Sequence, residues 1–162
     1  MLQTCRYGEQ IDGLKDLIND LPSGIVMAEI GCWRGESADI FLSSGKVKKF
    51  YAVDIWRAKN CDLAEKEFDQ RIGKRAVKLK MPMREALKYI KEKLDFIYID
   101  GSHTYQAVKE DIYYSKRIIK VGGIIGGHDY CDKYKDRVVR AVDELLGVPD
   151  KRYKDSSWIK RL

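Results

Sequence analysis

The sequence predicts an α/β fold built on a doubly wound, mainly parallel sheet. Strand-like and helix-like patterns alternate five times along the chain, and no repeat or linker interrupts them. Residues 25–30 are apolar except for Glu29, and the predicted strand 95–100 is apolar between its two terminal aspartates, as expected for strands covered on both faces. A chain of 162 residues fits one domain with a real core, and we expect a single domain over 1–162. Its expected parts are an N-terminal helix (1–24), a core (25–146) and a closing hairpin (147–162).

The first half of the chain opens with a helical repeat of apolar residues over 9–20, which Pro22 ends. The strand 25–30 then runs into a turn between Gly31 and Gly35, which opens the next helix. The elements that follow are, in order, the end of that helix at Gly45, a strand over 50–55, a helix over 62–73 that starts with a capping-box pattern, and a strand over 76–79.

The second half repeats this alternation. Pro82 suits the first turn of a helix whose apolar repeat runs as far as Leu94, directly before the strand 95–100. An apolar stripe from Val108 to Ile119 predicts the next helix. The remaining elements are a glycine-rich strand over 121–127, a helix over 136–146, and an antiparallel hairpin of 152–154 with 158–161.

Composition indicates a soluble intracellular protein. Charged residues make up 35% of the chain, and no apolar run approaches the length of a membrane span. The N-terminus lacks the apolar core of a signal peptide. The cysteines form no C-x-x-C pair, which argues against zinc or a disulfide framework and favours reduced thiols in the cytoplasm; they are Cys5, Cys32, Cys61 and Cys131.

The formal charge of +6 leaves two interpretations open. Lys and Arg alternate with Asp and Glu through most of the chain, which is typical of solvated faces. The tail is more one-sided and could form a basic patch for nucleic acid; its cations are Lys151, Arg152, Lys154, Lys160 and Arg161.

The stretch around the first strand is the main candidate for a ligand site. Glu29, Gly31 and Gly35 form the pattern E-x-G-x-x-x-G after a buried strand. The phosphate-binding pattern G-x-G-x-x-G is absent because Trp33 stands at its second glycine, where its indole would block a pyrophosphate. The alternative is that both glycines only let strand and helix pack closely.

Asp54 ends the second strand 23 residues after Gly31. An acidic side chain at this place can accept hydrogen bonds from both hydroxyls of a ribose. Asp54 could instead cap a helix or pair with Arg57. Trp56 could stack on an adenine or cover the edge of the sheet.

Polar groups also follow the fourth and fifth strands. The chain holds two histidines, and each lies near a carboxylate, in Asp100-x-x-His103 and His128-Asp129. If these strands are adjacent and parallel, all four groups meet at one mouth. Alternatively, Asp100 caps the next helix and His128 packs in a loop.

These segments together resemble a known family. EIGCWRGES, AVDIW, DFIYIDGSHTYQAVKEDI, GGIIGGHDY and VVRAVDELL occur in the order and spacing of the S-adenosylmethionine (SAM) dependent methyltransferases that include macrocin O-methyltransferase and cephalosporin-hydroxylase-like proteins. The resemblance covers residues 25–146 and implies the Rossmann-like fold of class I methyltransferases.

The resemblance also implies roles for single residues. SAM is expected at Glu29, Gly31, Cys32, Trp33, Arg34, Gly35, Ser37, Asp54, Ile55, Trp56 and Asp100. Mg²⁺ or another divalent cation is expected at Asp100, His128 and Asp129, with His128 standing where several relatives carry an acid. Catalysis is expected from His103, as general base, and from Asp100.

The predicted function is therefore O-methylation of a small hydroxylated acceptor, a sugar or a phenol. Arg34 and Ser37 are expected to meet the methionine carboxylate, and Trp33, Tyr105 and Tyr130 to line the acceptor pocket. The turn 80–83 offers adenine only apolar contact, and a second copy of the chain could cover the open site as a homo-oligomer. The alternatives are a methyltransferase of RNA, DNA or protein, and a SAM-binding or partner-binding module without catalysis.

Overall fold

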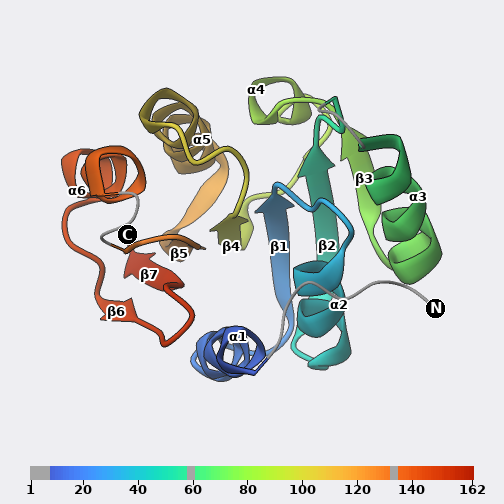
Figure 1. Ribbon diagram of the computed structural model, residues 1–162, viewed down its shortest axis with the longest axis horizontal. Coiled ribbons are helices and arrows are strands. Elements are labelled where there is room, and N and C mark those ends of the chain that lie inside the picture. The colour runs from blue at the N-terminus through green and yellow to red at the C-terminus, as the bar shows by residue number, and fades with distance from the viewer. Residues whose placement is uncertain (1–7, 58–60, 132–134) are drawn as a thin grey trace.

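The computed structural model describes residues 8–57, 61–131 and 135–162. These residues form a seven-stranded sheet in the order β3-β2-β1-β4-β5-β7-β6 (Figure 1). The strands are β1 (Ile25–Ile30), β2 (Val47–Asp54), β3 (Val77–Lys80), β4 (Leu94–Ile99), β5 (Ile119–Gly127), β6 (Lys151–Arg152) and β7 (Trp158–Arg161).

The five strands β1 to β5 are parallel, and β7 runs antiparallel to both β5 and β6. The register is set in the middle of the sheet, where Ala28 pairs with Tyr51 on one side and Ile97 on the other. The predicted mainly parallel sheet with an antiparallel C-terminal hairpin is confirmed. Because β1, β2, β4 and β5 are parallel, their carboxyl ends lie at one edge of the sheet.

Helices cover both faces of the sheet (Figure 1). They are α1 (Glu9–Asn19), α2 (Glu36–Ser43), α3 (Cys61–Ile72), the short 3₁₀ turn η1 (Gly73–Arg75), α4 (Met83–Ala86), α5 (Tyr105–Ile118), the π-helical turn η3 (Lys135–Val139) and α6 (Arg140–Leu146).

Two apolar cores lie between these layers. One core joins α1, α2 and α3 to the sheet through residues such as Leu17, Phe41 and Phe68. The other joins α4, α5 and α6 to the opposite face through residues such as Met83 and Ile112. Alternate residues of a strand enter different cores, as the period of two requires; in β4, Phe96 and Tyr98 face the first core while Ile97 and Ile99 face the second.

The helix predicted from Pro82 to Leu94 is much shorter than expected. α4 ends at Ala86, and Leu94 instead begins β4 with its side chain fully buried. Contacts distant in sequence compete with the helical repeat here, because the carboxylate of Glu92 accepts hydrogen bonds from Lys49 Nζ (2.6 Å) and Tyr51 OH (2.9 Å). These bonds tie the segment to β2, and single turns up to Ile90 replace the predicted helix.

Within the part of the chain that the structure describes, no helix combines the length and apolar character needed to cross a membrane. Cys32, Cys61 and Cys131 are free thiols, and Cys5 lies outside the described residues. The cytoplasmic location, the single domain and the homo-oligomer stay predictions.

Candidate functional site

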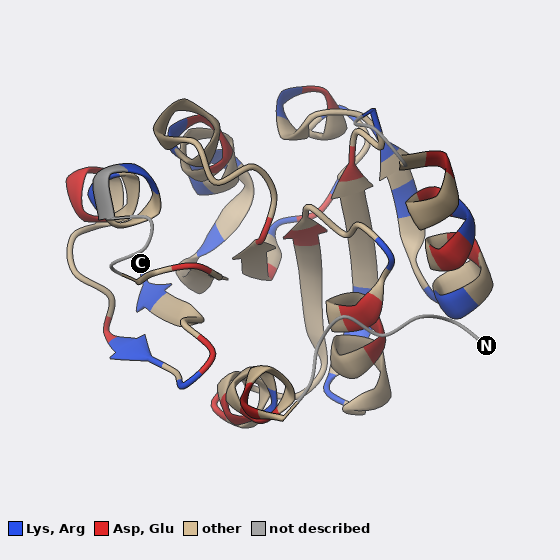
Figure 2. Ribbon diagram, viewed as in Figure 1, with Lys and Arg blue, Asp and Glu red and all other residues tan. Residues whose placement is uncertain are grey.

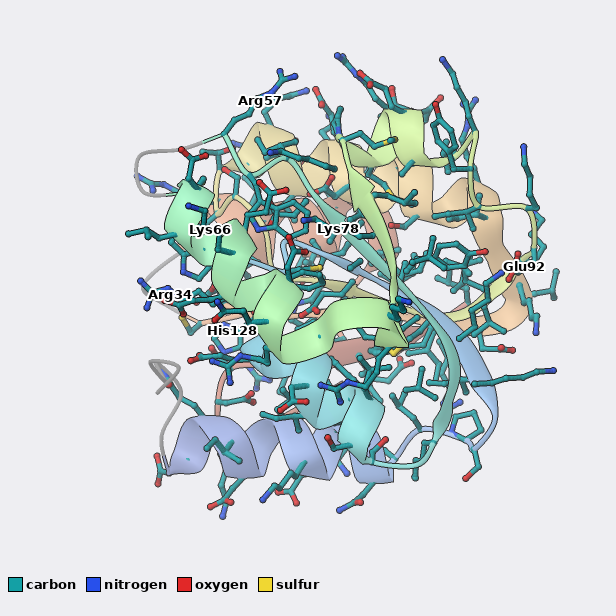
Figure 3. The ribbon with its side chains drawn as sticks, turned by 90° about the vertical axis from the view of Figure 1, so that its right-hand side faces the viewer. Arg34, Arg57, Lys66, Lys78, Glu92 and His128 are labelled. Atoms are coloured by element: carbon teal, nitrogen blue, oxygen red, sulfur yellow. The ribbon has the colours of Figure 1, made fainter. Side chains whose placement is uncertain are left out.

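A cleft of about 800 Å³ opens at the carboxyl ends of the parallel strands. Its walls come from the turns that follow β1, β2, β3, β4 and β5 and from the first two turns of α5. Arg34, Arg57 and His128 line this cleft and lie toward one side of the molecule in Figure 3, whereas Glu92 lies at the opposite side. The site is therefore at the edge of the sheet where doubly wound folds bind their ligands.

Gly31 fixes the turn after β1. Its φ is +90°, a conformation that favours glycine, and its N–H donates to the carbonyl of Val53 (2.9 Å). A Cβ at this position would lie 2.5 Å from the backbone nitrogen of Gly101 and would overlap the carbonyl oxygen of Asp100. The glycine thus lets the turns after β1 and β4 touch at the floor of the cleft.

Asp54 holds the next part of the wall. Its carboxylate accepts one hydrogen bond from the N–H of Trp33 (2.9 Å) and one from the N–H of Trp56 (2.8 Å). Both tryptophans have positive φ, 46° and 41°, so these bonds hold two unusual backbone turns in place. A carboxylate has about four acceptor positions, and Asp54 retains capacity for the two hydroxyls of a ribose.

The other residues of the glycine turn divide between the cleft wall and its support. Arg34 and Ser37 line the cleft, with Arg34 Nε 3.6 Å from Glu67 Oε2. Glu29 is fully buried and accepts a hydrogen bond from the Ser37 hydroxyl, so it supports the turn from behind. Gly35 does not line the cleft either; its φ of +78° opens α2, and a side chain there would meet Phe68.

Two further predicted cofactor residues line the cleft in different ways. Cys32 is buried, and burial raises the pKa of its thiol well above the ordinary value, so it acts as a small apolar side chain. Ile55 is 47% exposed at the rim.

Trp56 differs from the expectation that it contacts adenine. Its side chain is 3% exposed, packs against Phe68 with ring centroids 5.1 Å apart, and donates from Nε1 to the carbonyl of Trp33. It belongs to the core and does not line the cleft, because the positive φ of Trp56 turns the indole inward over α3.

The turns after β4 and β5 bring both histidines and both carboxylates together. His103 Nε2 lies 2.6 Å from Asp129 Oδ2. His128 Nδ1 lies 3.3 Å from the same oxygen and 3.8 Å from Asp100 Oδ1. The predicted meeting of these groups at one mouth is therefore present.

The two partners change each other's acidity. The hydrogen bond that His103 donates to Asp129 raises the pKa of His103, and burial opposes this only in part. Burial raises the pKa of Asp129, but hydrogen bonds from His103 and His128 outweigh it and hold the net pKa well below the ordinary value. Asp129 is thus ionised at neutral pH and favours a proton on the imidazole beside it.

The same cluster offers ligand atoms for a cation. One atom each from Asp100, His103 and Asp129 lies within 4.8 Å of the others. This set differs from the predicted one at one position, since His103 takes the place of His128. His128 lies beside the set and points its Nε2 toward the buried carboxylate of Asp155, 3.9 Å away.

Two aromatic residues predicted for the acceptor pocket lie elsewhere. The hydroxyl of Tyr105 donates to Glu144, and the hydroxyl of Tyr130 donates to Asp143 (2.8 Å), so both rings are held against α6. Trp33 does line the cleft, and its indole is 42% exposed.

Sequence reasoning missed the contribution of α5 to the cleft. Ala107, Glu110 and Asp111 line it from this helix, beside the Met81–Met83 turn. The signal was present, because Asp111 lies between the buried residues Val108 and Ile112 on the inner side of the helix.

Comparison with known proteins identifies the family. A family described as "Methyltransferase domain" matches residues 28–130, more than half of the chain. No curated protein matches the sequence. Among solved structures, an rRNA methylase from Streptococcus thermophilus is 15% identical, with 98% of this chain and 99% of that chain covered and a TM-score of 0.67.

Two other solved structures are similar. A TDP-rhamnose 3′-O-methyltransferase of calicheamicin biosynthesis is 15% identical, with 93% of this chain and 76% of that chain covered and a TM-score of 0.61. An N-methyltransferase from Bradyrhizobium japonicum is 16% identical, with 94% of both chains covered and a TM-score of 0.65. At these identities the likeness shows the shared fold. The family match and the fold together confirm the predicted enzyme class: the chain belongs to the methyltransferase-domain family and is a methyltransferase.

Proposed function

We propose that this enzyme transfers the methyl group of SAM to an oxygen of a small hydroxylated acceptor, as in the macrocin O-methyltransferase branch of the family. The observation that carries the proposal is the pairing of His103 Nε2 with Asp129 at 2.6 Å, at the mouth of the cleft. A transfer to oxygen needs a group that removes the hydroxyl proton, and this pair is such a group.

The reaction forms an O–CH₃ bond and breaks the S–CH₃ bond of SAM, which leaves as S-adenosylhomocysteine (SAH). The acceptor hydroxyl must also lose a proton. With the Nε2–H of His103 donating to Asp129, the lone pair of Nδ1 is available to take that proton, and the carboxylate stabilises the imidazolium that forms.

The cleft fits SAM at its other end as well. Asp54 retains acceptor positions for the ribose, and Arg34 with the first turn of α2 offers positive charge for the methionine carboxylate. The absence of a side chain at Gly31 lets the turns after β1 and β4 pack together at the cleft floor.

The three ligand atoms of Asp100, His103 and Asp129 would also fit a divalent cation, which would then replace the hydrogen bond between His103 and Asp129 and activate the acceptor in place of the histidine base. Such a cation would lower the pKa of the acceptor hydroxyl. Mg²⁺ prefers oxygen ligands, and the imidazole in this set favours borderline metals such as Mn²⁺ or Fe²⁺.

The rim of the cleft supports a flat or partly apolar acceptor. The side chains of Trp33 and Ile55 are 42% and 47% exposed there. Their surfaces suit the faces of a sugar or phenol ring.

The charge distribution favours a small acceptor over RNA. Lys and Arg are interspersed with Asp and Glu on α3 and α6 (Figure 2). In the basic tail, Lys151 pairs with Asp20 (2.5 Å) and Lys160 with Asp150 (2.7 Å). These pairs neutralise part of the positive charge that binding to a phosphate backbone would use.

The test is a panel of sugars, phenols and transcribed RNA incubated with labelled SAM. Label transferred to a sugar or phenol, and lost in His103→Ala, supports the proposal. Transfer to RNA alone would overturn it.

A further inference from the structure

One acidic side chain of the cleft takes no part in the methyl-transfer cluster. Asp111 lies on α5 and lines the cleft, half-buried. Among the described residues, its carboxyl group forms no hydrogen bond or ion pair. Glu110, the next acid on the helix, differs because it is exposed and accepts a hydrogen bond from Gln106 (2.9 Å). A half-buried carboxyl group without a partner is costly, and its place in a binding cleft suggests that a ligand supplies the partner.

The rest of the cleft limits which part of the cofactor can reach Asp111. On the proposed binding of SAM, the ribose lies at Asp54 and the methionine part lies at the glycine turn 31–35. The mouth at Asp129 is the reacting end. The wall that remains consists of the Met81–Met83 turn and of α5, and α4 packs directly against α5. This wall is the part of the cleft that remains for the adenine of the cofactor.

Two glycines, Gly31 and Gly101, form the floor beside this wall. A Cβ placed on Gly101 would lie 3.8 Å from Asp111 Oδ2 and 3.9 Å from the Cα of Gly31. The carboxyl group of Asp111 therefore lies next to the meeting point of the turns after β1 and β4, within reach of a planar group that enters the cleft.

We propose that Asp111 recognises the adenine edge of the cofactor by pairing with its 6-amino group and a neighbouring ring nitrogen. This inference rests on the proposed binding of SAM. The turn of Met81, Pro82 and Met83 offers the base apolar contact, so the polar recognition of adenine comes from α5.

The carboxyl group of Asp111 and the edge of adenine are complementary in hydrogen bonding when Asp111 is neutral. A protonated carboxyl group has one O–H donor and one carbonyl acceptor, and the adenine edge has a ring nitrogen acceptor beside an N–H donor. Burial, and then the charge of Glu110, raise the pKa of Asp111 to about 7, so the neutral form is well populated at neutral pH.

Calorimetry with two ligands tests the pairing. The ligands are SAH and an analogue that carries unsubstituted purine in place of adenine. At pH 6.5 the wild-type enzyme should bind SAH about 5- to 30-fold more tightly than the analogue, the range for one or two hydrogen bonds. Asp111→Leu should bind both ligands equally. Asp111→Asn should keep the preference, because an amide also offers a donor beside an acceptor and pairs with adenine.

Glu110→Gln is the matched control, since it removes a carboxylate from the same wall. Burial, the larger cause of the raised pKa of Asp111, is unchanged in this variant, so it should keep most of the wild-type preference at pH 6.5. Failure of the wild-type enzyme to bind SAH would overturn the proposed function together with this inference. Binding of SAH with no preference over the analogue, or a preference retained by Asp111→Leu, would overturn the inference alone.

A pH series decides the case even if Asp111→Leu does not fold. Affinity of the wild-type enzyme for SAH should fall on the order of tenfold between pH 6.5 and pH 8.5 as Asp111 ionises, and Asp111→Asn should show no such fall. The other charged groups near this wall are retained in both proteins and cancel in the comparison; they are Asp54, Arg57, Asp100, His103, Glu110 and the Arg84–Glu85 pair of α4. Equal pH dependence in the two proteins would contradict the proposed pairing.

Discussion

His103 Nε2 lies 2.6 Å from Asp129 Oδ2, although the two residues follow different strands. The adjacency of β4 and β5 in the sheet creates this contact, because Ile99 pairs with Gly127 and both chains then leave the sheet at the same edge. The strand order therefore brings the turn that carries the histidine next to the turn that carries its partner.

His103→Ala should lower turnover about 10²- to 10⁴-fold, the range for a positioned base, and leave the affinity for SAH unchanged. Steady-state rates with labelled SAM and calorimetry with SAH measure the two quantities. Asp143→Asn is the control. It removes a carboxylate of α6 that accepts a hydrogen bond from Tyr130 and lies outside the cleft lining, so the turnover of this variant should be normal. An unimpaired His103→Ala enzyme would exclude this residue as the base.

Removal of divalent cations should abolish activity, and Mg²⁺ or Mn²⁺ should restore it, since the ligand atoms of Asp100, His103 and Asp129 lie within 4.8 Å of one another. Asp129→Ala should lose activity and metal dependence together. Electron paramagnetic resonance of added Mn²⁺ reports binding independently of turnover. Full activity in excess chelator is the result that contradicts a metal-assisted reaction.

Most of the fold could be predicted because β1, β4 and the second half of β5 are apolar runs, with glycines at or just after their ends. The periodicity failed where contacts distant in sequence decide the structure. Leu94 continues the helical repeat that starts at Met83, but it lies in β4, where it pairs with Ile119 and is fully buried. Ile119 likewise completes an apolar helical stripe and in fact begins β5, opposite Leu94.

The site shows the same division. Residues directly after strands, such as Asp54 and Asp129, could be placed from the sequence because the end of a parallel strand fixes their position. The direction in which a loop side chain points could not be predicted from the sequence. Trp56 turns into the core and Tyr105 pairs with Glu144, and neither outcome follows from local sequence.

Asp54→Ala should weaken binding of SAH by about 1.5 to 3 kcal/mol, the value for a lost hydrogen bond to a charged group. The loss has two sources, the ribose contact and the bonds that hold the N–H groups of Trp33 and Trp56. Calorimetry at constant salt gives the difference. NAD should not bind the wild-type protein, because the indole of Trp33 stands where a pyrophosphate needs a glycine. Tighter binding of NAD than of SAH would contradict the assigned cofactor.

Gly31→Ala should lower the free energy of unfolding by about 2 to 4 kcal/mol and prevent binding of SAH, because the added Cβ would overlap the turn after β4. Gly24→Ala is the control that measures the cost of a positive φ alone, without steric overlap of the added Cβ. Its φ of +76° is also positive, but nothing lies within 4 Å of the added Cβ, so a cost of about 1 kcal/mol is expected with binding intact. Thermal unfolding and calorimetry measure both effects, and equal costs at the two positions would argue against the close packing of the two turns.

Asp111→Asn should stabilise the protein above neutral pH. In the unfolded chain Asp111 titrates near its ordinary pKa of 3.8, and in the folded protein burial, with the charge of Glu110, raises the pKa to about 7. Between these values the folded protein binds a proton that the unfolded chain has released, so the free energy of unfolding falls as the pH rises through this window. The side chain at position 111 of the Asp111→Asn variant does not titrate, so this contribution to the pH dependence is absent from the variant. At pH 4 the two proteins should therefore differ little, and at pH 8 the variant should be more stable by about 1 to 3 kcal/mol, less than the full shift implies because the group is partly exposed. Urea unfolding at the two pH values measures the difference, and a wild-type stability that follows the same pH dependence as Asp111→Asn would show that the carboxyl group is already ionised in the folded protein.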